Sequence, residues 1–183
     1  IATMQTTPAL DDFAERYAAG KPQVVWATLV GDLETPVSAY LKLAEGRANA
    51  FLLESVEGGA VRGRYSMIGL KPDVLWRCRG AVAEINRKPH LDADAFEPCV
   101  QPPLQALRTL IAESAIEMPP ELPPMAAAVF GYLGYDMVRH MEELGTPGPD
   151  PLGVPDGLMM RPTVVVIFDA VREPREAADG GSD

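Results

Sequence analysis

Residues 50–87 read AFLLESVEGGAVRGRYSMIGLKPDVLWRCRGAVAEINR, and this stretch decides the fold class. It holds four short runs of apolar, β-branched and aromatic residues, separated by glycine-rich or Pro-Asp turns, which predicts consecutive strands. The expected strands are 50–55, 64–70, 74–80 and 81–87. In the last two, polar and apolar residues alternate, as in an antiparallel hairpin with one face in water. We therefore expect an α+β fold with mostly antiparallel sheet and a few packing helices.

Three helices are expected around these strands, at residues 8–20, 35–46 and 102–114. Their apolar residues recur at the three- and four-residue spacing of a helix that packs on a core. The middle helix has the clearest boundaries, since Thr35 suits the N-cap, Pro36 the first turn and Gly46 the end.

The remaining segments predict two or three more strands. VVWATLV at 24–30 is rich in strand formers, and residues 126–144 run from a small-residue strand through two glycines into a helix. TVVVIFDAV at 163–171 is a nearly all-apolar strand, followed by a polar tail at 172–183 that we expect to be disordered. A central strand followed only by such a tail suggests that the sequence belongs to a longer protein.

Composition limits the classes of partner. The chain has 183 residues and a net charge of −10, with 26 acids against 16 bases, which disfavours binding to nucleic acid or to an anionic membrane. It lacks the roughly 20 continuous apolar residues of a membrane span. It also lacks a basic start followed by an apolar signal core, so we expect a cytoplasmic protein. The two cysteines and two histidines are isolated in sequence, which disfavours a protein-only metal site.

The glycine-rich turn between the first two expected strands is the most suggestive polar feature. Glu54 ends one strand and Arg64 begins the next, with glycines at 58, 59 and 63 between them. A phosphate-binding loop is disfavoured, because Arg64 stands where that motif has lysine and Tyr65 where it has serine or threonine. A strand also follows, where the motif needs a helix. Two accounts stay open. The acid and the guanidinium form an ion pair of little energetic value, or Glu54 holds an ammonium while Arg64 or nearby N–H groups hold a carboxylate. The second account describes a site for a free amino acid.

A second motif, GYLGYD at residues 131–136, is best interpreted as structural. Its glycines favour tight packing of a strand on a helix, with the two tyrosines as half-buried anchors. The sequence has no nucleophile elbow, HExxH motif or dinucleotide fingerprint, so no complete active site is predicted.

Three segments together resemble a known family. DLETPVSAYLKL at 32–43, FLLESVEGG with RGRYSMIG at 51–69, and FGYLGYDMVRHMEEL at 130–144 occur in that order. They resemble the N-terminal region of the large subunit (component I) of anthranilate synthase, from about Asp32 to Val171. One departure is that Ala127 and Ala128 stand where many relatives carry glycine.

This resemblance implies an activity for the complete large subunit. That subunit makes anthranilate from chorismate and ammonia and releases pyruvate, with Mg²⁺ as cofactor, in tryptophan biosynthesis. Ammonia comes from glutamine through a separate glutamine amidotransferase, component II. Chorismate and Mg²⁺ bind in a C-terminal part that has no counterpart here. Residues 1–171 would thus be an N-terminal regulatory region, inactive alone and without catalytic residues or a bound metal.

The resemblance also implies an allosteric site for the feedback inhibitor L-tryptophan. Leu53, Glu54 and Ser55 match the family's LLES element, and Arg64 matches a basic position at the start of the next strand; Tyr65 and Ser66 follow it. Two alternatives are the N-terminal region of aminodeoxychorismate synthase component I, of the folate pathway, and a structural or docking domain that binds no effector.

Overall fold

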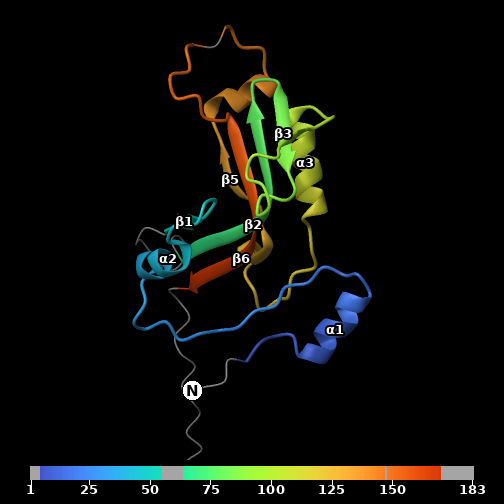
Figure 1. Cartoon of the computed structure of the whole chain (residues 1–183), viewed down its shortest axis with the longest axis vertical. Coiled ribbons are helices and arrows are strands. Elements are labelled where there is room, and N and C mark those ends of the chain that lie inside the picture. Colours follow the sequence, from blue (N-terminus) through green and yellow to red (C-terminus); the bar gives the residue numbers. More distant parts are fainter. Residues whose placement is uncertain (1–4, 55–63, 147, 170–183) are drawn as a thin grey trace, which may run out of the picture.

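A computed structural model describes residues 5–54, 64–146 and 148–169, and it has an antiparallel sheet with two α-helices packed against it and a third lying apart from it (Figure 1). The helices are α1 (Leu10–Ala18), α2 (Pro36–Ala44) and α3 (Pro103–Glu113), with short 3₁₀ helices η1 (Pro124–Ala127) and η2 (Tyr135–His140). The strands are β1 (Phe51–Leu53), β2 (Tyr65–Arg79), β3 (Val82–Asn86), β4 (Glu97–Pro98), β5 (Phe130–Leu133) and β6 (Gly157–Asp169). Within the described residues their order is β4-β3-β2-β6-β5, with β1 paired to β2. Every strand pair is antiparallel, which confirms the predicted fold class.

The long strand β2 corrects one prediction. We expected two strands, at 64–70 and 74–80, joined by a Pro-Asp turn. They form one strand, because β6 pairs with β2 both before and after the Pro-Asp pair. In place of the turn there is a bulge between Pro72 and Val74, preceded by Lys71 with a φ of +51°. Because a bulge bends its strand, the β2–β6 pair changes direction at this point (Figure 1).

The core lies on both sides of this bend. Above it, α3 packs against a buried cluster that includes Trp76, Cys78 and Leu110. Below it, α2 packs against Ile68 and Leu70. A third cluster, formed by Leu75, Phe130 and Met160, links β2, β5 and β6. The buried position of Cys78 agrees with its interpretation as a small apolar residue rather than a reactive thiol.

The three predicted helices are confirmed within their expected ranges, but α1 has no buried residue, so its expected packing on a core is wrong. Thr35 caps α2 as expected: its hydroxyl oxygen accepts a hydrogen bond from Ser38 N at 3.0 Å, and Ser38 Oγ accepts one from Thr35 N at 2.9 Å. This reciprocal pair is a capping box, which satisfies two backbone donors at the start of the helix.

Two segment predictions are wrong. Residues 24–30 form no strand, and among the described residues only an isolated bridge joins Trp26 to Thr7. In 126–144 only β5 is a strand, and η2 replaces the expected helix. None of the helices in the described ranges is long and apolar enough to cross a membrane. The predicted tail at 172–183 lies outside the described residues.

Candidate functional site

The candidate site lies where β1 ends, β2 begins and β6 ends (Figure 1). Leu53 pairs with Met67 in the β1–β2 register, so one further step places Glu54 opposite Ser66. On the other edge of β2, Tyr65 pairs with Asp169. The sheet therefore gathers the predicted residues with an acid from β6 that sequence reasoning did not select.

The predicted residues divide between the two faces of the sheet. Ser66 is buried, and its partner on β6, Phe168, packs in the cluster beneath α2, so Ser66 lies on the α2 face. Because side chains alternate along a strand, Leu53 and Tyr65 belong to the opposite face, and Leu53 is half exposed. Continued alternation puts the exposed Glu54 on the same face as Ser66. These residues form a strand-end cluster rather than one closed pocket wall.

Arg64 is bound to Asp169. Its Nε and Nη2 donate hydrogen bonds to Asp169 Oδ1 and Oδ2, each at 2.7 Å, and its guanidinium lies 4.9 Å from the centre of the Tyr65 ring. Hydrogen bonding to Asp169 raises the pKa of Arg64 above its usual value. No ion pair joins Glu54 to Arg64 within the described residues, so the ion-pair account, one of the two left open by the sequence, does not hold. The physical reason is β6, which brings a carboxylate beside the arginine from 105 residues away.

Ser55 and the glycine-rich turn at 55–63 lie outside the described residues. The LLES element is therefore described as far as Glu54. Asp169 is the residue that the sequence argument missed. Its signal is an acid at the end of an otherwise apolar run, which becomes informative only once the β2–β6 pairing is known.

The GYLGYD motif is structural, though not in the expected way. A Cβ added at Gly131 would lie 1.9 Å from the Leu158 carbonyl oxygen, so the glycine permits close packing of β5 on β6, strand on strand. Gly134 N also donates to Asp156 O at 2.6 Å. Tyr132 OH donates to Pro155 O at 2.9 Å, but Tyr135 is largely exposed, so its prediction as a half-buried anchor is wrong.

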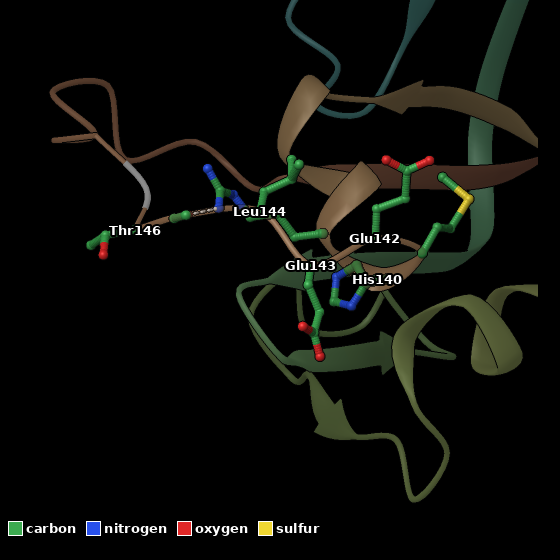
Figure 2. Close-up of a pocket in the computed structure, with 8 residues that line it drawn as sticks. His140, Glu142, Glu143, Leu144 and Thr146 are labelled. Carbon is green, nitrogen blue, oxygen red and sulfur yellow. Dashed lines mark hydrogen bonds between the residues drawn. The ribbon is translucent and has the colours of Figure 1, made fainter.

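An open hollow lies beside η2 and is lined by residues 139–146 (Figure 2). The carboxylates of Glu142 and Glu143 point away from each other, and His140 Nε2 lies 3.6 Å from the sulfur of Cys78. Burial, with a smaller contribution from Asp156, raises the pKa of Cys78 to about 11, so the thiol is not a nucleophile near neutral pH. Across the described ranges, no three His, Cys, Asp or Glu residues lie close enough together to hold a metal ion. The hollow therefore offers no catalytic arrangement.

The chain was compared with protein-family models, with curated proteins and with solved structures. No protein-family model matches the sequence. The chain is 54% identical over 164 residues to anthranilate synthase component 1 of Cereibacter sphaeroides, covering 90% of this chain and 33% of that protein. It is 39% identical over 156 residues to anthranilate synthase component 1 of Thermus thermophilus, covering 85% of this chain and 32% of that protein. The chain thus spans about a third of the length of these relatives.

A solved structure is also similar. The crystal structure of anthranilate synthase component I from Streptococcus pneumoniae TIGR4 matches with a TM-score of 0.49 and 24% sequence identity, covering 81% of this chain and 30% of that chain.

Proposed function

Because this chain belongs to the family of anthranilate synthase component 1 over the third of those proteins that it spans, we propose that it is part of an anthranilate synthase. The complete protein would be a lyase of tryptophan biosynthesis that converts chorismate and ammonia into anthranilate and pyruvate. The 54% identity over 164 residues is the observation that carries this proposal.

Within that enzyme, the role we propose for this chain is regulatory: it contributes the site for L-tryptophan, the end product of the pathway. An α-amino acid requires an acceptor for its ammonium and a donor for its carboxylate. The strand-end cluster supplies both, since the exposed carboxylate of Glu54 and the guanidinium of Arg64 lie at the ends of neighbouring strands. Tryptophan would inhibit by binding one arrangement of the enzyme more tightly than the other.

The catalytic steps belong to residues outside this chain in our proposal. The described residues offer no metal-ligand set, so no step through Mg²⁺ is assigned to them. Chorismate and Mg²⁺ would bind the remaining two-thirds of the polypeptide, and ammonia would come from the component II glutamine amidotransferase. We expect the chain alone to be inactive and the complete enzyme to be cytoplasmic.

One observation favours a second candidate, a structural or docking domain that binds no effector. Arg64 already has a carboxylate partner in Asp169, as expected of a residue that only stabilises the sheet. The two candidates differ in whether Glu54 contributes to tryptophan binding.

Calorimetric titration of L-tryptophan into the complete subunit tests the regulatory role. We expect Glu54→Gln to weaken binding about 10- to 100-fold, the range of a lost hydrogen bond to a charged group. Glu97→Gln is the matched control, because Glu97 is also an exposed acid but lies on β4. Ser55→Phe provides a second variant in the LLES element. If Glu54→Gln and Ser55→Phe both bind tryptophan like the wild type, the regulatory assignment is lost. A wild-type subunit that binds no tryptophan supports the docking domain.

A further inference from the structure

We propose that Asp169 is an internal competitor of the effector: its carboxylate occupies, in the unliganded chain, the place on Arg64 that an amino acid's carboxylate would take. This inference rests on the proposed function and concerns how the same site is regulated. The carboxylate of Asp169, on β6, would then lower the affinity of the site for the effector.

The first argument is the geometry of the guanidinium. Arg64 presents its Nε–Nη2 edge to Asp169 in a two-point contact, with both distances at 2.7 Å. This edge holds one carboxylate at a time, and the carboxylate of an α-amino acid is chemically the same group. A second carboxylate on the remaining edge would lie beside that of Asp169 and be repelled by it. The effector therefore gains the full charge of Arg64 only when Asp169 moves away.

The second argument is that an exchange of carboxylates on Arg64 requires a rotation of the Asp169 side chain and not a break in the backbone of β6. Among the described residues, Tyr65–Asp169 is the last pair in the β2–β6 register. The side chains of Arg64 and Asp169 are 38% and 16% exposed, so the guanidinium can be reached from solvent although most of the Asp169 side chain is buried. The Tyr65 ring, 4.9 Å from the guanidinium, would keep the cation in place after Asp169 moves.

The third argument comes from a second arginine–aspartate contact on the same two strands. Arg161 of β6 binds Asp73 of β2 through Nε and Nη2, each at 2.8 Å. Its Nη1 also donates to Ser114 Oγ at 3.1 Å, so both edges of this guanidinium are used. No group in the described ranges binds Nη1 of Arg64. The contact at the bulge therefore uses both edges of its guanidinium, whereas among the described residues the contact at the strand ends uses one edge alone.

The proposal has a regulatory consequence. Asp169 pairs with Tyr65, so displacing its side chain from Arg64 couples ligand binding to a contact between β2 and β6. A local exchange of carboxylates then changes a contact between two paired strands, which is a differential contact of the kind that allostery requires.

Titration of L-tryptophan into the complete subunit tests the inference with Asp169→Asn. Removing the competing charge should lower the dissociation constant about two- to fivefold, the gain expected when a partly exposed ion pair no longer competes. Asp73→Asn is the matched control, since it makes the same change at the Arg161 contact and should leave the dissociation constant unchanged. In an Arg64→Gln background, adding Asp169→Asn should no longer lower the dissociation constant, because the cation for which the carboxylates compete is gone. A merely structural role for Asp169 predicts no tightening.

The possible results distinguish a failure of this inference from a failure of the proposed function. If wild-type protein binds tryptophan and folded Asp169→Asn binds it no more tightly, this inference is overturned while the proposed function stands. If the wild type binds no tryptophan, the regulatory role and this inference fall together. Asp169→Ser, which also removes the carboxylate, replaces Asp169→Asn if circular dichroism shows that the first variant is unfolded.

Discussion

The ring of Phe51 on β1 lies directly over Gly69 on β2, so close that a Cβ added at Gly69 would lie 2.1 Å from Cε1 of the ring. The same ring stacks at a tilt on Phe130 of β5, with 4.8 Å between the ring centres. A glycine on β2 thus lets one aromatic side chain join three strands. This contact holds in place the short strand that carries Leu53 and leads to Glu54.

Gly69→Ala should therefore destabilise the fold. The added methyl group must displace the Phe51 ring, and overpacking of this kind costs about 1–3 kcal/mol of unfolding free energy. Urea denaturation followed by circular dichroism measures the change. Gly31→Ala is the control, because a Cβ there meets nothing within 4 Å. Equal denaturation midpoints for Gly69→Ala and the wild type would contradict the packing argument.

Arg161→Lys should also destabilise the protein, by about 1 kcal/mol, because lysine cannot reproduce the two-point contact with Asp73 together with the bond to Ser114. Hydrogen bonding to Asp73 raises the pKa of Arg161, in agreement with a stable pair. The same denaturation experiment measures the loss. Arg108→Lys, on the exposed side of α3, should leave the midpoint unchanged. A similar shift in both variants would mean that the geometry of the Arg161 contact is irrelevant.

Features that depend on neighbouring residues could be predicted from the sequence. The capping box of α2 needs only Thr35 and a residue three positions later. The β2–β3 hairpin is another local feature, since its strands are adjacent in sequence. The helices and the antiparallel character of the sheet follow from such patterns, which is why the fold class was predictable.

The errors arise where a distant segment decides. Pro72 and Asp73 read as a turn, yet β6 pairs with β2 on both sides of them and turns the step into a bulge. A contact of Arg64 with Glu54 was one of the two accounts that the sequence left open, and the partner of Arg64 is instead Asp169, brought in by the same strand. No local pattern reveals that β2 and β6 are neighbours, so both the bulge and the partner of Arg64 required the structure.

The thiol of Cys78 predicts how stability changes at alkaline pH. Burial, helped by the charge of Asp156, raises its pKa from 9.0 to about 11. Between these values the unfolded chain loses the proton while the folded chain keeps it, so stability should fall as pH rises from 9 to 11 and show no such slope below 9. The loss is on the order of 2 kcal/mol. Denaturation midpoints at pH 8 and 10.5 should differ less in Cys78→Ala than in the wild type. Cys99→Ala should reduce the difference less than Cys78→Ala does, because burial also raises the pKa of Cys99 but that side chain is only partly buried. An identical alkaline slope in the wild type and Cys78→Ala would show that Cys78 ionises as readily in the folded chain as in the unfolded one.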